Sequence, residues 1–133
     1  MTYHLQIVTP DGQRYDGQAV RMIVPTIDGQ VGILARHINF VTALGMGPAK
    51  LVTEDGERHA ACIGGMLAVT DGEVKVVATT FEWADEIDVE RAKVSLARAE
   101  KMLADPACDE QTKQYANARM KRAQVRLGIA GKK

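Results

Sequence analysis

Hydrophobic positions follow two different patterns along this chain of 133 residues. In residues 1–80, short apolar runs are separated by glycine, and some of them alternate with polar positions, as Tyr3, Leu5 and Ile7 do. A period of two is typical of a β-strand with one buried face. After residue 85, apolar positions recur every three or four residues, which is typical of helices. The pattern therefore predicts a β-structured part followed by a helical part.

Turn signals divide the first part into short strands. Asp-Gly pairs supply the positive φ that tight turns need, and they occur at 11–12, 16–17, 28–29, 55–56 and 71–72. Between them the pattern predicts strands over residues 3–8, 20–24, 31–34, 40–44, 49–53, 58–63, 66–70 and 73–78. Gly64 and Gly65, inside an apolar run, predict a bulge or a close backbone approach. Many short strands with frequent turns favour a β-sandwich or barrel.

The second part predicts two helices joined by a turn. Residues 73–127 contain no glycine and a single proline, which separates two helical patterns. The first helix is expected to have Asp88 as its N-cap and to end near Ala104. The second is expected to run from residue 109 or 110 to residue 127, with Gly128 ending it. The predicted fold is therefore α+β, with an antiparallel β-sandwich over 1–84 and an antiparallel two-helix hairpin over 85–133.

The apolar seams of these helices are rich in alanine. They consist of Val89, Ala92, Leu96, Ala99 and Leu103 on the first helix, and Ala116, Met120, Ala123 and Leu127 on the second. A buried leucine contributes about 1.5–3 kcal/mol and an alanine far less, while ordering each backbone residue costs about 1–2 kcal/mol. The hairpin is therefore expected to be weakly held and able to detach. Just before it, Trp83 is expected to pack the hairpin base against the sandwich.

Basic residues flank both seams. Helical spacing groups Asp88, Arg91, Ser95 and Arg98 on the first helix, and Arg119, Arg122 and Arg126 on the second. If the two groups face each other, they form a guanidinium-lined cleft suited to a polyphosphate. If they do not, the arginines form a solvated face. Spacing alone leaves both interpretations open.

Composition narrows the functional classes. Lysine plus arginine and aspartate plus glutamate both number 17, so the net charge is zero and long-range attraction to nucleic acid is weak. The final residues from Gln111 nevertheless carry seven basic and no acidic side chains. Cys62 and Cys108 have no metal-ligand spacing and are expected to be reduced thiols. We expect no signal peptide, no membrane-spanning segment and no metal site.

No catalytic motif is apparent. The three histidines fall on separate predicted strands or loops, and the chain lacks a phosphate-binding glycine-rich loop, a nucleophile elbow and a zinc pattern. We therefore expect a protein that is not itself an enzyme and needs no catalytic cofactor.

Three stretches resemble the epsilon subunit family of the F-type ATP synthase. Residues 28–44 read Asp-Gly-Gln-Val-Gly-Ile-Leu-Ala-Arg-His-Ile-Asn-Phe-Val-Thr-Ala-Leu. They are similar to the family's Gly-Glu-Leu-Gly-Ile-x-Pro-Gly-His-x-Pro-Leu-x-Thr-x-Leu. Residues 8–12 and 63–69 match as well, the second being like the family's Ser-Gly-Gly-x-Leu-Glu-Val. The resemblance covers essentially the whole chain.

This resemblance implies a subunit of the central stalk that couples proton-driven rotation to ATP synthesis. Its expected partners are the gamma subunit, the ring of c subunits and, in an extended state of the hairpin, the alpha and beta subunits. The c-ring contact is expected at Gln30, Arg36 and His37, although Gln30 replaces a usual glutamate and Ala35-Arg36 replaces Pro-Gly. The implied location is peripheral, on the cytoplasmic face of a bacterial membrane, with the membrane reached only through the complex.

The resemblance also implies a regulatory ATP site. Some bacterial members bind ATP through an Ile/Leu-Asp-x-x-Arg-Ala motif, which stands here at residues 87–92. The positions that carry over are Glu82, Ile87, Asp88, Arg91, Ala92, Arg98, Arg122 and Arg126. Arg119 lies outside that pattern. ATP bound there is expected to hold the hairpin closed, and the extended hairpin is expected to inhibit ATP hydrolysis.

Two other classes remain at this stage. One is a β-sandwich module for a carbohydrate or peptide, with the hairpin as a dimerisation arm. The other is a nucleic-acid adaptor using the basic C-terminal segment. The few aromatic residues disfavour the first, and the zero net charge disfavours the second, so no nucleic-acid partner is expected.

Overall fold

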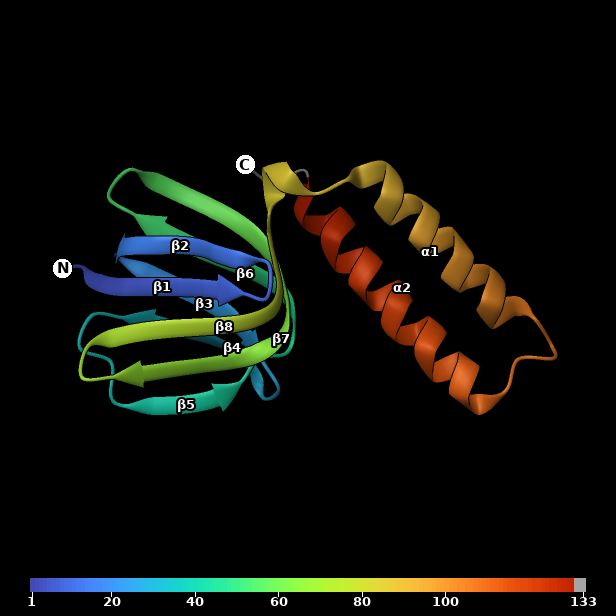
Figure 1. The fold of residues 1–133 in the computed structure, drawn as a ribbon, viewed down its shortest axis with the longest axis horizontal. Helices are drawn as coiled ribbons and strands as arrows, with labels where there is room; N and C mark the ends of the chain where they lie inside the picture. The colour runs from blue at the N-terminus through green and yellow to red at the C-terminus, as the bar shows by residue number, and fades with distance from the viewer. Residues whose placement is uncertain (131–133) are drawn as a thin grey trace.

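The computed structural model describes residues 1–130, which form a β-sandwich and a helical hairpin (Figure 1). The strands are β1 (Tyr3–Thr9), β2 (Gly12–Ala19), β3 (Arg21–Thr26), β4 (Gly29–Leu34), β5 (Phe40–Ala43), β6 (Met46–Thr53), β7 (Gly56–Thr70) and β8 (Glu73–Trp83). A short 3-10 helix, η1 (Ala84–Glu86), leads into α1 (Val89–Ala104) and α2 (Glu110–Ala130).

The strands are hydrogen-bonded in the order β2-β1-β8-β7-β6-β3-β4, with β5 paired to β7. This sheet folds over, so that β1, β2 and β8 lie in front of β3, β4 and β6 in Figure 1. Every pairing between named strands is antiparallel except that of β1 with β8, which is parallel over residues 4–8 and 73–77. The antiparallel sandwich predicted from the sequence is thus present, with one parallel pair that the pattern did not reveal.

Alternating side chains build the core between the layers. Tyr3, Leu5 and Ile7 are all buried, as their spacing predicted. The hydroxyl of Tyr3 donates a hydrogen bond of 2.8 Å to the carbonyl oxygen of Ile33 and thereby links β1 to β4. The Cys62 thiol is buried in the same core, and burial raises its pKa to about 12, so it remains protonated.

A histidine joins three strands on the outer surface. The two ring nitrogens of His4 on β1 each lie 2.5 Å from a carboxylate oxygen, one of Asp16 on β2 and one of Glu73 on β8. Two acceptors require a proton on both nitrogens, so the geometry fits the imidazolium form. Hydrogen bonding to Asp16 and then to Glu73 raises the pKa of His4 accordingly.

One predicted turn was wrong, and so was the division of one strand into two. Asp16 and Gly17 lie within β2, which the sequence pattern missed, and Gly17 pairs with Leu5 of β1. Gly17 has no positive φ, unlike the glycines of the other four Asp-Gly pairs. Continuous pairing with β1 outweighs the local turn preference here. The strands predicted over 58–63 and 66–70 are parts of the single strand β7.

The glycine pair in β7 makes the close approach that was predicted. Gly64 and Gly65 have φ values of 69° and 120°, and a Cβ on Gly65 would lie 2.1 Å from the carbonyl oxygen of Val77. At this point β7 changes its partner from β6 to β5. Only glycine allows the backbones of β7 and β8 to come this close.

The helix boundaries agree with the sequence at α1 and differ at α2. The Asp88 carboxylate accepts a hydrogen bond of 3.0 Å from the backbone N–H of Arg91, as an N-cap should. The predicted end of α2 at Leu127 was wrong, because the helix continues through Gly128 to Ala130. Ile129 is buried at the hairpin base, and that packing outweighs the helix cost of about 1 kcal/mol for glycine.

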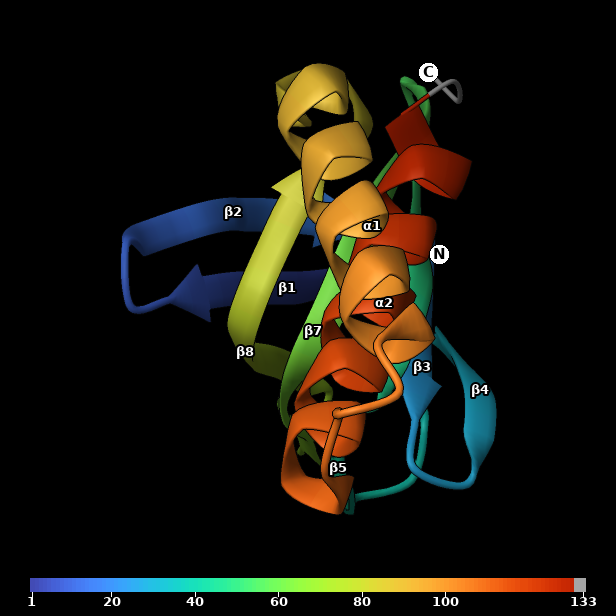
Figure 2. The same ribbon diagram turned by 90° about the vertical axis from the view of Figure 1, so that its right-hand side faces the viewer.

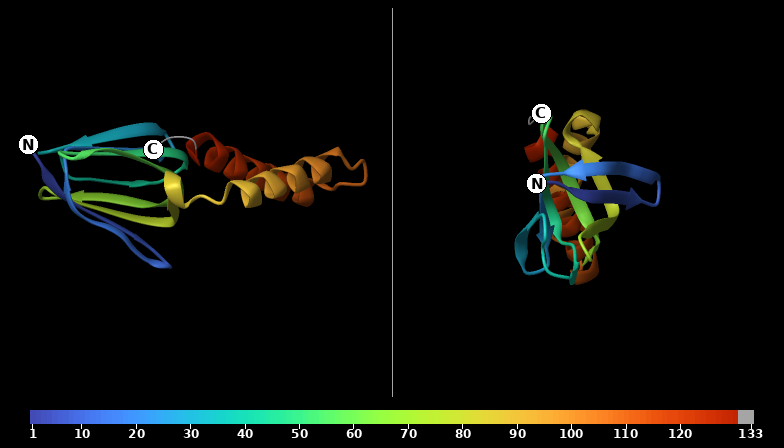
Figure 3. Two further views of the ribbon diagram at one scale, coloured as in Figure 1. Left: turned by 90° about the horizontal axis from the view of Figure 1, so that it is seen from above. Right: turned by 90° about the vertical axis from the view of Figure 1, so that its left-hand side faces the viewer.

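Alanines form the interface between the two helices. Ala92, Ala99, Ala116 and Ala123 are buried, whereas the leucines and Met120 of the seams are only half-buried. Figures 2 and 3 show that α2 lies between α1 and the sandwich and that the hairpin projects from one end of the β-structure. Among the described residues, α2 contacts β6, β7 and η1.

A small apolar cluster seats the hairpin. Ala61, Ala84, Ile87 and Ile129 pack together there. The role predicted for Trp83 was therefore wrong, because its ring belongs to the core of the sandwich. It lies beneath the guanidinium of Arg58, at 3.7 Å from the ring centroid.

Candidate functional site

A cleft of about 490 Å³ lies between the two helices near the base of the hairpin. Its walls come from the end of β8, from η1, from the exposed side of α1 and from α2. The lining residues are Glu82, Glu86, Asp88, Arg91, Ala92, Val94, Ser95, Arg98, Arg119 and Arg126. The arginines predicted from helical spacing thus face a shared cleft, with the exception of Arg122.

Six of the eight positions assigned to ATP by resemblance line this cleft. They are Glu82, Asp88, Arg91, Ala92, Arg98 and Arg126. Ile87 does not line it, because its side chain is buried in the cluster that seats the hairpin. Arg122 is half-buried on α2 but is not among the lining residues. Arg119, which the family pattern leaves out, is in the wall of the cleft.

Carboxylates neutralise part of the positive charge. The Nε of Arg126 donates to Glu82 over 2.5 Å, which ties α2 to the end of β8. Arg14, which does not line the cleft, donates to Glu86 of its wall over 2.9 Å. In the described residues, Arg91, Arg98 and Arg119 form no ion pair with a carboxylate. The cleft therefore presents unpaired guanidinium groups suited to an anion with several oxygens.

Of the three positions predicted to contact a c-ring, one lies on β4 and two lie just after it. Gln30 and Leu34 are both exposed on β4, an edge strand, and their even spacing places them on the same outward face. Arg36 follows the end of β4, with a left-handed φ of 67°, and His37 comes next. Gln30 and the Arg36–His37 pair thus lie at opposite ends of β4 and are not brought together in one cluster.

An apolar face covers neighbouring strands of the sandwich. Val41 on β5, Met66 on β7 and Val77 on β8 are exposed by 64%, 47% and 46%. The register places Met66 opposite Val77, and Ala68 opposite Val41. Exposed apolar side chains gathered across adjacent strands are typical of a surface that meets another protein.

Residues 1–130 hold no group of three His, Cys, Asp or Glu side chains placed to bind a metal ion. Over the same residues, neither helix has the length and apolar character needed to cross a membrane.

Comparison with known families decides the assignment. Residues 2–84 match the family described as ATP synthase, Delta/Epsilon chain, beta-sandwich domain. Residues 85–131 match its long alpha-helix domain. The chain belongs to the ATP synthase delta/epsilon chain family. The comparisons give no support to a free-standing sandwich module or a nucleic-acid adaptor.

Bacterial relatives from this family align over nearly their whole length. The chain is 40% identical over 129 residues to the ATP synthase epsilon chain of Exiguobacterium sp., covering 96% of this chain and 95% of the relative. It is 36% identical over 129 residues to the ATP synthase epsilon chain of Shouchella clausii, covering 97% and 95%.

Chains in two solved ATP synthase structures share the fold. A chain in the mitochondrial ATP synthase of Euglena gracilis superposes with a TM-score of 0.82 at 23% identity, covering 97% of this chain and 81% of that one. A chain of the central stalk and c-ring structure from Tetrahymena thermophila superposes with a TM-score of 0.62 at 15% identity, covering 96% and 95%.

Proposed function

We propose that this delta/epsilon family member is the epsilon subunit of a bacterial F-type ATP synthase and that its hairpin senses ATP. The chain itself catalyses nothing in this proposal. Its sandwich couples the proton-driven rotor to the catalytic subunits, and its hairpin regulates ATP hydrolysis. The observation that carries the regulatory part is the cleft between α1 and α2, where unpaired arginines face one another.

The chemistry of the cleft fits a nucleoside triphosphate. Arg91 and Arg98 offer forked donors to phosphate oxygens. Glu82 and Asp88, at the base of the hairpin, offer acceptors for the hydroxyl and amino groups of a nucleoside. In this proposal Ile87 and Arg122 support the site from its edge, Ile87 by fixing the start of α1 on the sandwich.

Weak packing makes the hairpin responsive to such a ligand. The fully buried side chains of the two helical seams are alanines, which bury little apolar area, and the seam leucines are only half-buried. A ligand present at ten times its dissociation constant stabilises the closed state by about 1.4 kcal/mol. That shift matters only when the closed and extended states are close in free energy, which the alanine interface favours. In the extended state the helices would reach the alpha and beta subunits and block hydrolysis.

In this proposal the sandwich makes the contacts that stay the same whether the hairpin is closed or extended. The apolar face of β5, β7 and β8 is the proposed contact with the gamma subunit. The outward face of β4, from Gln30 to Arg36 and His37, is the proposed contact with the c-ring. Ile38, exposed by 76%, adds apolar area at the Arg36 end. The membrane is then reached only through the complex, at its cytoplasmic face.

Calorimetric titration with ATP tests the regulatory site. Arg91→Ala and Arg98→Ala should each weaken ATP binding by about tenfold, because each removes charge-assisted hydrogen bonds. Lys93→Ala is the matched control, since Lys93 is exposed on α1 and does not line the cleft. It should change the affinity by less than about twofold.

Asp88 needs a separate variant because it also caps α1. Asp88→Ser keeps a capping oxygen and removes the charge, so a loss of ATP affinity in this variant reports on the site rather than on the helix. If the wild-type protein shows no saturable ATP binding, the regulatory site is withdrawn. The assignment to the central stalk then rests on the family match.

A further inference from the structure

Arg119 differs from the other arginines of the cleft because its side chain is hydrogen-bonded to a neutral group. Its Nε donates a hydrogen bond of 2.9 Å to the hydroxyl oxygen of Ser95, from α2 across to α1. Because Ser95 is neutral, this bond fixes the guanidinium without cancelling its charge. Arg126 gives its Nε to the Glu82 carboxylate instead, so its charge is paired. Arg119 thus keeps four of its five N–H donors and its full charge for a ligand.

Preorganisation adds to this difference. Arg91 and Arg98 are exposed on α1, and no side-chain hydrogen bond in the described residues holds either of them. Arg119 is half-buried and already fixed in one direction. Binding of an anion at Arg119 therefore costs less side-chain conformational entropy than binding at an exposed arginine.

The unpaired positive charge of the cleft extends away from its base. Glu82, Glu86 and Asp88 lie at the base of the hairpin, where Glu82 pairs with Arg126 and Glu86 pairs with Arg14, so the charge there is largely balanced. Arg98 lies ten residues after Asp88 along α1, a rise of about 15 Å, and Arg119 also lies beyond the base. A ligand with a polyphosphate tail is therefore oriented with its nucleoside toward the base and its terminal phosphate toward the tip.

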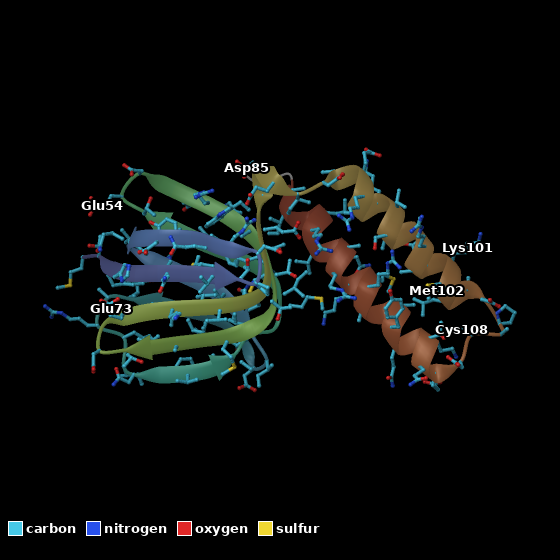
Figure 4. The ribbon with its side chains drawn as sticks, in the orientation of Figure 1. Glu54, Glu73, Asp85, Lys101, Met102 and Cys108 are labelled. Carbon is cyan, nitrogen blue, oxygen red and sulfur yellow. The ribbon has the colours of Figure 1, made fainter. Side chains whose placement is uncertain are left out.

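A second hollow continues the cleft in that direction. It has a volume of about 340 Å³ and is lined by Arg98, Lys101, Met102, Asp105 and Arg119. Figure 4 shows Lys101 and Met102 toward the tip of the hairpin, whereas Asp85 lies at its base. Arg98 and Arg119 line both hollows, so they stand where the terminal phosphate of an oriented triphosphate would arrive.

We propose that Arg119, positioned by Ser95, binds the terminal phosphate of the nucleotide and makes the cleft select a triphosphate over a diphosphate. This inference rests on the nucleotide site proposed above and assigns its phosphate specificity to a residue outside the family's ATP motif. Removal of Arg119 should then weaken the binding of ATP much more than the binding of ADP, because ADP ends one phosphate short of Arg119.

Titrations of the full chain with ATP and with ADP test the assignment. Arg119→Ala should weaken ATP binding by about tenfold or more and ADP binding by less than about threefold, so the preference for ATP collapses. Lys121→Ala is the matched control. It removes a positive charge from the same helix at an exposed position outside the cleft, and it should leave both affinities unchanged.

Ser95→Ala separates phosphate binding from loosening of the hairpin. This variant and Arg119→Ala lose the same hydrogen bond between the helices, but Ser95→Ala keeps the guanidinium. Both should show the same helical circular dichroism and melting temperature. Ser95→Ala should lower the preference for ATP by only about twofold to threefold, the effect of a less well positioned arginine.

The outcomes distinguish this inference from the function on which it rests. Wild-type protein that binds neither nucleotide would contradict both. Wild-type protein that prefers ATP, with the same preference in Arg119→Ala, would overturn only the role of Arg119. Equal losses for ATP and ADP in Arg119→Ala and Ser95→Ala would show that the bond only holds the hairpin together, which would also overturn it.

Discussion

His4 carries a pH dependence that follows from its two carboxylate partners. Its pKa is raised above the ordinary 6.5 in the folded state by hydrogen bonding to Asp16 and to Glu73. The raised folded-state value means that the stabilising contribution is complete below pH 6.5 and is lost as the pH rises through the folded pKa. His4→Gln should therefore lower the melting temperature at about pH 6 and have little effect at about pH 9.

Thermal unfolding of the two proteins across this range checks the prediction. Gln6→Ala is a suitable control, since Gln6 lies on the same face of β1 and does not titrate. A destabilisation by His4→Gln that stays constant with pH would show that His4 acts only through packing.

At the scale of single residues, the sequence indicated chemistry better than geometry. Alternation identified Tyr3, Leu5 and Ile7 as buried, and helical spacing grouped Arg119 with the other arginines of the cleft. Nothing in the sequence showed that Arg36, which stands where the family's motif has glycine, adopts a left-handed φ of 67°. Arginine has no local preference for that conformation.

Among the elements, α2 gives the clearest test of helix propensity against tertiary packing, because it contains a glycine near its end. Gly128 is exposed within the helix, and a Cβ there would meet no atom within 4 Å. Gly128→Ala should raise the free energy of unfolding of the helical part by about 1 kcal/mol, because glycine loses more backbone entropy than alanine. Urea unfolding followed by circular dichroism measures the change.

Gln124→Ala is the comparison, because Gln124 is exposed on the same helix and glutamine already forms helices well. An unchanged or lower stability for Gly128→Ala would mean that Gly128 is needed for a conformation other than the helix described here.

The misplaced end of α2 shows why element boundaries are hard to derive from sequence. Glycine after an apolar seam usually ends a helix, and only the tertiary contacts of Ile129 with Ala61 and Ile87 override that signal. The same holds for β2, where pairing with β1 overrides the turn preference of Asp16-Gly17. The start of α1 was predictable because its cap, Asp88, is local in sequence.

For the molecule as a whole, the structure predicts two parts of unequal stability. The sandwich buries aromatic and branched side chains, whereas the interface between the helices buries alanines. Ala99→Leu places extra volume in that interface and should cost about 1–3 kcal/mol. The hairpin should then be cleaved faster by a protease while the sandwich stays intact.

Ala97→Leu provides the control, since it makes the same substitution at an exposed position of α1. If the hairpin inhibits as proposed, a complex assembled with Ala99→Leu should also hydrolyse ATP more slowly than one assembled with Ala97→Leu. Equal protease sensitivity of the two variants would contradict the account of the alanine interface.

The parallel pairing of β1 with β8 has a consequence for synthesis on the ribosome. β1 leaves the exit tunnel well before its central neighbour β8, which begins only at Glu73. Until then the nascent chain can form only the local β1–β2 ribbon at that edge, with the other side of β1 unpaired. The sheet is completed once β8 has emerged, and the hairpin, which follows β8 in the chain, then attaches to a sheet whose strands are all available.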